Sequence, residues 1–479
     1  MKVLSVASEI FPLIKTGGLA DVVGALPAAL APHGVEMISM MPGYPAVMAT
    51  LQNANPLHHF EDLYGGPAQV LQGSAKGLAM LVLDAPHLYN RPGNPYLGTD
   101  GKDWPDNAAR YAALSFVAAE LAMGRIGGQQ FDILHLHDWQ AALAAVYVKY
   151  ADMAAPKPKT IMTVHNIAFQ GTFPAFTFSS LRLPPHAYAV DGVEYYSNVS
   201  YLKGGLAAAD AITTVSPTYA HEICTPEFGM GLDGLLRARR SVLHGIVNGI
   251  DTDIWNPETD KDLASPFSVK KLEKRSANKR ALEQRLSLET SDGILHGVVS
   301  RLTGQKGLDM LAEHLDWLVN TGARLALVGT GEPQLEAIYR EAAQRYPGRI
   351  GVSFKYDEGL SHLVQGGADT MLVPSRFEPC GLTQLYGLRY GCVPIVGRTG
   401  GLADTVIDAN DSAMAAGVAT GIQFSPITAP NLQAALIRAH QLYENKKAWA
   451  AIQKFGMSQD VSWDRSATVY AALYQSLKK

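Results

Sequence analysis

Short apolar runs alternate with amphipathic segments along the first half of the chain. The run Val3–Ala7 precedes a glycine pair, and apolar residues then recur at helical spacing from Ala20 to Leu30. Short continuous apolar runs are typical of buried strands, and spacings of three and four residues are typical of helices. Further strands are expected over Leu78–Leu83, Ile133–Leu136, Ile161–Val164 and Ala211–Val215, and helices over Asn107–Leu121 and Ala141–Tyr150.

The alternation starts again near residue 290. Strands are expected over Ile294–Ser300, Arg324–Val328, Ile350–Phe354, Thr370–Pro374 and Val393–Val396, and helices over Leu308–Val319, Pro333–Arg345 and Leu382–Tyr390. Strands that alternate with helices predict a parallel sheet covered on both faces. We therefore expect an α/β protein with two Rossmann-like, doubly wound lobes facing a cleft.

The stretch Val242–Pro257 separates the two halves. It is rich in Gly, Asn, Asp and Pro, which is typical of a loop or hinge. We expect an N-terminal lobe over residues 1–243, a C-terminal lobe over 244–457 and a final helix over 458–479. The polar segment Asp260–Glu289 is expected to be helical.

Composition excludes several classes of protein. The 479 residues have a formal net charge of -4, with both signs spread along the chain, whereas a nucleic-acid-binding surface needs a clustered basic face. Three cysteines without a Cys-x-x-Cys pair offer neither a disulfide framework nor a zinc site. No apolar run approaches a membrane span, and Glu9, Pro12 and Lys15 interrupt the first apolar run. We expect a cytoplasmic protein without nucleic-acid or membrane partners.

Polar motifs follow three expected strands of the first half. Lys15–Asp21 places a lysine and a glycine pair before a helix, where free backbone N–H groups can approach an anion. His135–Trp139 places the Asp138 carboxylate at a strand end, and His165–Asn166 ends the next strand. In open α/β sheets, ligands bind beyond such strand ends. Turn or helix-cap roles are the alternatives, and core packing of the histidines in His135–Trp139 is favoured over metal binding because no third ligand is near.

The second half carries three comparable motifs. Arg301–Gly307 holds two cations in one loop, which suits a diphosphate, although a solvated basic loop is the alternative. In Ser375–Thr383 a strand is followed by a helix, whose first N–H groups form an anion site. Glu378 lies at the edge of that site. For Glu378 a helix-capping role is the alternative. Arg398–Asp404 repeats the glycine pair of the first loop.

Two other ligand classes are not indicated. Gly329-Thr330-Gly331 follows a strand, but Gln334 stands where a dinucleotide fingerprint needs its third glycine. Asp251-Thr252-Asp253 could hold Mg²⁺ with a diphosphate. Because it lies in the expected hinge, away from the strand ends, a turn role is preferred. We expect no metal and no cofactor.

The polar motifs that follow the strands in both halves of the chain, together with Val247–Asp251, resemble those of bacterial glycogen synthases and plant starch synthases. They occur in the family's order and run nearly from end to end. The resemblance implies a GT-B glycosyltransferase that transfers glucose from ADP-glucose to the non-reducing 4-hydroxyl of an α-1,4-glucan, with retained anomeric configuration. ADP-glucose and glycogen are thus the expected partners.

The resemblance also implies roles for individual residues. Its catalytic set is Lys15, Asp138, His165, Arg301, Lys306 and Glu378, and its other substrate contacts are Gly18, Tyr96, Asn248, Tyr356, Gly381, Leu382 and Thr383. Lys15, Arg301 and Lys306 would clamp the diphosphate, while Asp138, His165, Asn248 and Glu378 would hold the glucosyl group. Gly18 and the Gly381–Thr383 amides would contact phosphate. Tyr96 would lie near the acceptor, and Tyr356 would stack on the base, although Lys355 precedes it where the family usually has glycine.

The same resemblance assigns the lobes. The N-terminal lobe would be the acceptor and glucosyl side, the C-terminal lobe the nucleotide-diphosphate side, and the final helix would pack back on the N-terminal lobe. Two alternatives stay open. The chain could be another nucleotide-sugar enzyme of this fold, such as a UDP-sugar transferase or an epimerase, because fold does not determine function. It could also be a catalytically silent glucan-binding protein, although the intact constellation of Lys15, Arg301, Lys306 and Glu378 argues against this.

Overall fold

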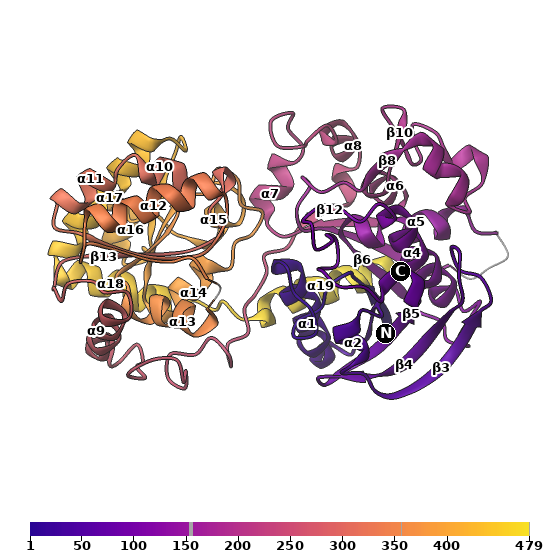
Figure 1. Ribbon diagram of the computed structural model, residues 1–479, viewed down its shortest axis with the longest axis horizontal. Coiled ribbons are helices and arrows are strands. Elements are labelled where there is room, and N and C mark those ends of the chain that lie inside the picture. The colour runs from indigo at the N-terminus through magenta and orange to yellow at the C-terminus, as the bar shows by residue number, and fades with distance from the viewer. Residues whose placement is uncertain (153–156, 356, 479) are drawn as a thin grey trace. The chain divides into compact units, whose positions relative to one another are not determined.

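The computed structural model describes residues 1–152, 157–355 and 357–478, and its contacts divide the chain into two units (Figure 1). Unit 1 consists of Met1–Asn248 and the chain from Trp463 onward, and unit 2 is Gly249–Ser462. The boundary expected after residue 243 would cut strand β12 (Leu243–Gly245), which pairs with its neighbour in the sheet of unit 1. Unit 1 therefore runs on to Asn248.

Unit 1 is built on a mixed sheet with the strand order β12-β11-β7-β6-β1-β2-β5-β4-β3. The strands are β1 (Lys2–Val6), β2 (Glu36–Pro42), β3 (Gln52–Phe60), β4 (Ala68–Ala75), β5 (Leu78–Asp84), β6 (Ile133–His137), β7 (Lys159–Val164), β11 (Ala211–Thr214) and β12. Neighbours from β12 to β5 are parallel, whereas β4 is antiparallel to β3 and β5. The parallel part brings the carboxyl ends of β1, β6 and β7 to one edge.

Helices cover both faces of this sheet. They include α1 (Gly18–Leu30), α4 (Asn107–Ala122), α5 (Asp138–Tyr150), α6 (Tyr201–Ala208), α7 (Pro217–Glu222), α8 (Asp233–Ala238) and α19 (Trp463–Lys478), with the shorter α2 (Pro45–Met48) and α3 (Pro86–Tyr89). A small antiparallel sheet joins β8 (Thr172–Pro174), β10 (Asn198–Ser200) and β9 (Glu194–Tyr195). Trp463, Tyr470 and Tyr474 of α19 are buried in one core cluster with α1 and the central strands. The end of the chain is thus part of unit 1.

Unit 2 contains a fully parallel sheet in the order β15-β14-β13-β16-β17-β18. The strands are β13 (Leu295–Val299), β14 (Arg324–Val328), β15 (Ile350–Ser353), β16 (Thr370–Val373), β17 (Val393–Gly397) and β18 (Ile422–Phe424). Along β14, Leu325 and Leu327 belong to one core cluster and Ala326 and Val328 to another. Successive side chains of a strand point to opposite faces, so both faces of the sheet are buried at β14. A strand buried on both faces appears in the sequence as a continuous apolar run.

The helices of unit 2 form one layer on each face of its sheet (Figure 1). They are α9 (Arg275–Arg285), α10 (Leu308–Ala312), α11 (Leu315–Asn320), α12 (Pro333–Arg345), α13 (Glu358–Gly367), α14 (Thr383–Tyr390), α15 (Gly400–Thr405), α16 (Asp411–Ala416), α17 (Ala429–Glu444) and α18 (Lys446–Met457). Leucines of α10, α11, α12 and α17 pack in one core cluster, and residues of α9 and α13 pack in the other.

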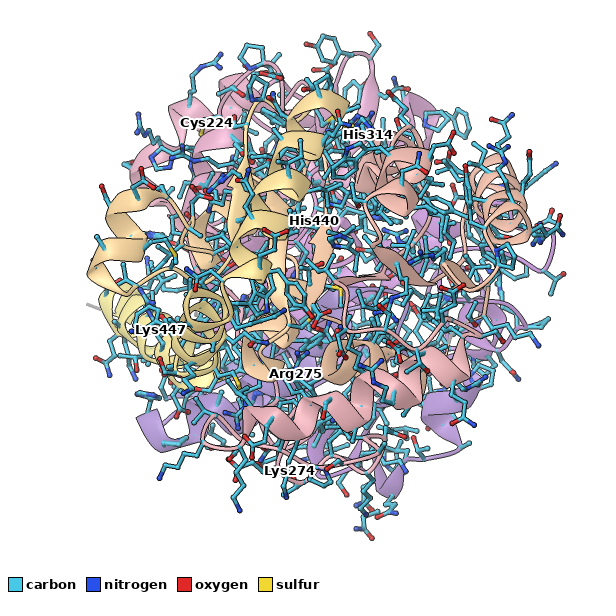
Figure 2. All side chains as sticks on the ribbon, turned by 90° about the vertical axis from the view of Figure 1, so that its left-hand side faces the viewer. Cys224, Lys274, Arg275, His314, His440 and Lys447 are labelled. Atoms are coloured by element: carbon cyan, nitrogen blue, oxygen red, sulfur yellow. The ribbon has the colours of Figure 1, made fainter. Side chains whose placement is uncertain are left out.

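Two helix predictions were wrong in detail. Of the segment Asp260–Glu289, only α9 and a short 3₁₀ turn before it are helical. Pro266 disfavours helical backbone at Ser265, whose N–H instead bonds the Asn278 side chain. The helix expected over Leu308–Val319 is broken at His314, which is labelled in Figure 2. Its ring donates to the carbonyl of Ala429 at 2.7 Å.

Among the residues that the structure describes, no helix combines the length and the apolar character that crossing a membrane requires. The three cysteines are free. Cys224 is half-buried and labelled in Figure 2, while Cys380 and Cys392 are buried.

Candidate active site

The strongest grouping of predicted site residues lies at the carboxyl edge of the sheet of unit 2. The Lys306 ammonium lies 2.5 Å from Glu378 Oε2, and the Ser375 hydroxyl donates to the same oxygen at 2.8 Å. Both charged side chains are largely buried. A pocket opens beside this pair and is lined by Val299, Ser300, Lys306, Leu308, Leu372, Val373, Pro374, Ser375, Glu378, Gly381, Leu382 and Thr383. The structure thus joins two predicted motifs that lie far apart in the sequence.

Close backbone packing holds the Arg301–Gly307 loop over β16. Gly307 has a φ of 69°, and a Cβ there would lie 2.0 Å from the carbonyl oxygen of Pro374. Glycine is therefore required directly after Lys306. Arg376 forms two further contacts with this region: its guanidinium pairs with Asp309 at 2.6 Å, and its backbone N–H donates to the carbonyl of Gln305. These contacts hold Lys306 at the pocket.

Gly329 and Gly331 support the same loop from its other side. A Cβ on Gly329 would lie 1.8 Å from the carbonyl of Ser300, and one on Gly331 would lie 2.1 Å from that of Leu302. Leu302 N–H donates to Thr330 at 2.9 Å. This glycine pair therefore serves close backbone packing beneath the cationic loop.

The amino end of α14 faces the pocket. Gly381, Leu382 and Thr383 line the cavity, and Gly381 has a φ of 72°. Gly381 lacks a Cβ that would collide with the Gln384 side chain. The N-cap residue of this helix, Leu382, has no side chain that could accept a hydrogen bond from the first N–H groups. Its first N–H groups, reinforced by the helix dipole, can therefore bind phosphate oxygens.

The Arg398–Asp404 motif supports the loop that carries Glu378. Gly401 N–H donates to the carbonyl of Glu378 at 3.1 Å. Gly400 has a φ of 43°, and a Cβ there would lie 2.0 Å from that same carbonyl oxygen. A Cβ on Gly401 would lie 2.2 Å from the carbonyl of Cys380. The glycine pair thus lets two backbone segments meet directly behind Glu378.

Arg301 differs from Lys306 in its surroundings. Its side chain is exposed and forms no ion pair with any residue in the described ranges. An unpaired guanidinium beside the pocket-lining Ser300 is available to bind a phosphate group.

In unit 1, Glu9 anchors the Lys15–Asp21 loop. Its carboxylate accepts hydrogen bonds from the N–H and hydroxyl of Thr16, the latter at 2.6 Å, and from the Tyr96 hydroxyl. Burial, and secondly the charge of Glu9, raise the pKa of Tyr96 well above its ordinary value, so this phenol stays protonated. Sequence reasoning missed Glu9, although a carboxylate just beyond the first strand is itself a signal. Lys15 is exposed and pairs with Asp21 at 2.8 Å, and Gly18 begins α1.

Asp138 and His165 lie together at the ends of β6 and β7. Asp138 Oδ1 accepts the backbone N–H of His165 at 2.7 Å. Asp138 has a φ of 55°, which is uncommon for a residue with a side chain and occurs preferentially at functional sites. Burial raises the pKa of its carboxyl to about 7, and the charge of Glu9 acts in the same direction. Burial also lowers the pKa of His165 to about 3, so its imidazole is neutral.

The remaining predicted residues have different surroundings. Asn248 is buried, and its Oδ1 has no hydrogen-bond partner within the described ranges, which leaves an acceptor for a ligand. Tyr356 lies outside the described residues. His135 is buried and lies 2.7 Å from the Tyr474 hydroxyl, so it belongs to the core rather than to a metal site.

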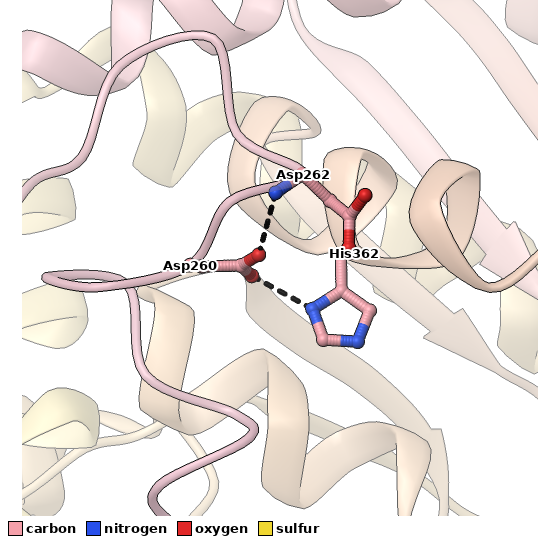
Figure 3. Close-up of side chains that lie close together, drawn as sticks. All are labelled: Asp260, Asp262 and His362. Atoms are coloured by element: carbon pink, nitrogen blue, oxygen red, sulfur yellow. Dashed lines mark hydrogen bonds and ion pairs between the residues drawn. The ribbon is translucent and has the colours of Figure 1, made fainter.

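Two groups of acidic residues have side chains of the kind that bind metal ions. Asp251 Oδ1 accepts the N–H groups of Asp253 and Ile254, which is the turn role predicted for this motif. Asp260, Asp262 and His362 have ligand atoms within 4.8 Å of one another (Figure 3). Asp260 is already bonded, however, because one oxygen accepts the Asp262 N–H and the other lies 2.7 Å from His362 Nδ1. The Tyr390 hydroxyl also donates to Asp260, so this group forms a structural hydrogen-bond network.

Comparison with known proteins gives a consistent result. A family described as "Starch synthase catalytic domain" matches residues 2–238, and "Glycosyl transferases group 1" matches residues 281–452. A glycogen synthase of Rhodopseudomonas palustris (strain BisA53) is 57% identical over 478 residues, which cover 100% of this chain and 97% of that protein.

Two solved structures extend the comparison. The catalytic domain of starch synthase IV from Arabidopsis thaliana, bound to ADP and acarbose, superposes with a TM-score of 0.89 at 32% identity and covers 100% of this chain and 99% of its own. Sucrose-phosphate synthase from Thermosynechococcus elongatus, at 16% identity and a TM-score of 0.61, covers 99% of this chain and 98% of its own and shows the fold alone. The expected GT-B fold is confirmed. With full-length relatives at this level of identity, the chain belongs to the family of bacterial glycogen synthases and plant starch synthases, and it is a glycosyltransferase.

Proposed function

We propose that this enzyme transfers glucose from ADP-glucose to the non-reducing 4-hydroxyl of an α-1,4-glucan, with retention of the anomeric configuration. The observation that carries the proposal is the pocket of unit 2, where the Lys306–Glu378 pair and the open amino end of α14 meet. The Arabidopsis relative, whose structure contains ADP and acarbose, supports a nucleotide donor and a glucan-like acceptor.

The donor side follows from where charge develops. Breaking the bond between the anomeric carbon and the phosphate oxygen leaves negative charge on ADP. Lys306 and the first amides of α14 would stabilise that charge from fixed positions, with Arg301 and Lys15 as further cations. Preorganised groups of this kind usually supply the largest catalytic contribution. ADP is a good leaving group, so a strong protein acid is not needed.

The glucosyl side would use Asp138, His165, Asn248 and Glu378. The unpaired Oδ1 of Asn248 can accept a bond from a sugar hydroxyl. Both carboxylates are held by their own surroundings, because Glu378 bonds Lys306 and Ser375 while Asp138 bonds the His165 amide. A covalent intermediate would need a carboxylate placed to attack the anomeric carbon from the face opposite ADP. Retention is proposed instead to proceed by attack of the acceptor hydroxyl on the face from which ADP leaves, guided by the departing phosphate.

The test is donor-dependent incorporation of labelled glucose into glycogen, comparing ADP-glucose with UDP-glucose. We expect transfer from ADP-glucose, with products that carry α-1,4 linkages by proton NMR. A reaction without acceptor controls for hydrolysis. Preferential use of UDP-glucose would indicate a different transferase of this fold. Glycogen binding without transfer from either donor would identify a catalytically silent glucan-binding protein.

A further inference from the structure

A row of buried polar side chains crosses one face of the sheet in unit 1. In the parallel register Ser5 pairs with His135, and Thr163 pairs with both His137 and Thr213. Paired residues point to the same face of a sheet. All five residues are fully buried. Buried polar groups need hydrogen-bond partners, and the two histidines of this row find theirs both within the row and in Tyr474 and His165 beside it.

The two histidines of this row have different partners. His135 lies 2.7 Å from the Tyr474 hydroxyl of α19 and 2.6 Å from Thr163 Oγ1. His137 Nε2 lies 3.2 Å from Ser5 Oγ, and its Nδ1 lies 3.0 Å from His165 Nε2. The His135 branch therefore leads to the terminal helix, and the His137 branch leads to the predicted glucosyl pocket.

The available partners determine which atom donates in each hydrogen bond of the His137 branch. Within the described part of the chain, the Ser5 hydroxyl bonds only His137. A buried O–H donor left unsatisfied is costly, so this hydroxyl donates to His137 Nε2. A neutral imidazole carries one proton, which for His137 then lies on Nδ1 and is donated to His165 Nε2. The proton of His165 must accordingly lie on Nδ1.

We propose that His137, oriented by Ser5, is a positioning residue that holds His165 in the Nδ1–H tautomer, so that His165 presents a hydrogen-bond donor to the transferred glucosyl group. The inference rests on the proposed function, in which His165 contacts that group. His165 Nδ1 bonds no described residue and is therefore available to a sugar hydroxyl. Burial lowers the pKa of both imidazoles, His165 to about 3, so the donor is a neutral N–H group.

The kinetic test replaces His137 and compares a matched control. His137→Phe should lower kcat/KM for glucose transfer by about 10- to 100-fold, by analogy with the partners that orient metal-binding histidines. Tyr474→Phe removes a hydroxyl from the equally buried His135 branch and should leave kcat/KM within about twofold. Ser5→Ala, a smaller change in case His137→Phe does not fold, should also lower kcat/KM without changing KM for glycogen.

The second readout is the tautomer itself, which a purely structural role of His137 would not move. Imidazole ¹⁵N shifts of histidine-labelled protein, assigned with His165→Ala, should show the Nδ1–H form of His165 in the wild type. In His137→Phe and Ser5→Ala the signal should move toward a mixture of tautomers. An Nε2–H form in the wild type, an unchanged signal in both variants, or a changed tautomer with unchanged transfer would each overturn the proposal. A wild type with the expected tautomer but no transfer from ADP-glucose would instead refute the proposed function.

Discussion

The ammonium of Lys306 and the carboxylate of Glu378 form a largely buried ion pair, with 2.5 Å between Nζ and Oε2. Because the pair is shielded from water, each group depends on the other for charge compensation. An arriving diphosphate would compete for Lys306, and the Glu378 oxygen that loses this partner, while still accepting the Ser375 hydroxyl, could then also accept a sugar hydroxyl. Donor binding and glucosyl recognition would thus be coupled through one ion pair.

Lys306→Ala should lower kcat by about 10²–10³, the usual loss for one preorganised electrostatic donor, with a smaller rise in KM for ADP-glucose. It should also reduce the free energy of unfolding by about 1–3 kcal/mol, because Glu378 is left buried without its partner. Steady-state kinetics and urea unfolding measure the two effects. Lys270→Ala, at an exposed lysine of the same unit, is the control. Unchanged kcat would remove Lys306 from the site.

Arg301→Ala should separate catalysis from stability. Since this guanidinium is exposed and forms no ion pair with the described residues, its loss should leave the free energy of unfolding within about 0.5 kcal/mol of wild type. The fall in kcat should still reach about 10²–10³. A variant with wild-type kcat would identify Arg301 as part of a solvated basic loop.

Asp138→Asn should change how stability depends on pH. The folded carboxyl has its pKa raised to about 7 from an ordinary value of 3.8, so the folded state binds more protons than the unfolded state between these values. The contribution of the Asp138 carboxyl to the wild type's free energy of unfolding is fully present below about pH 3.8, and it is lost as the pH rises through 7. Between pH 4 and pH 8, the variant's free energy of unfolding should therefore fall less than the wild type's.

Unfolding curves across this range test the Asp138 prediction, and Asp191→Asn, at an exposed carboxylate of the same unit, serves as control. The control should parallel the wild type. Parallel curves for Asp138→Asn as well would show that its carboxyl titrates normally.

Gly400→Ala should damage the site through the backbone behind Glu378. Its Cβ would lie 2.0 Å from the Glu378 carbonyl oxygen, whereas Gly417 has a similar left-handed backbone with nothing within 4 Å of its Cβ position. Gly417→Ala should cost only the conformational penalty of about 1–2 kcal/mol. Gly400→Ala should cost more and also lower kcat. Equal unfolding free energies and equal activities would exclude the steric role.

Glucose transfer should survive chelation. The proposed cations and helix amides would neutralise the diphosphate without a metal, and the carboxylate Oδ1 of Asp251 is engaged by two backbone N–H groups of its own turn. Activity in EDTA should match activity in added Mg²⁺. Complete loss on chelation, restored by Mg²⁺ or Mn²⁺, would revive a metal-assisted mechanism.

The sequence by itself determined the parallel strands and the motifs at their ends. Strands such as β14 are buried on both faces, so they appear as continuous apolar runs, and Arg324–Val328 was predicted without error. Polar residues directly after such runs lie at the carboxyl edge of the sheet, which is why the segments around Asp138 and Lys306 could be identified. Local signals of this kind need no knowledge of the remaining chain.

Only the tertiary structure decided which of these residues meet. Lys306 and Glu378 are 72 positions apart, and His137 and His165 are 28 apart. Their contacts depend on strand order and register, which periodicity does not encode. The same holds for Glu9, whose role appears only once Thr16 and Tyr96 converge on it. Residues distant in sequence are brought together by packing of whole elements, and that packing is a property of the folded chain.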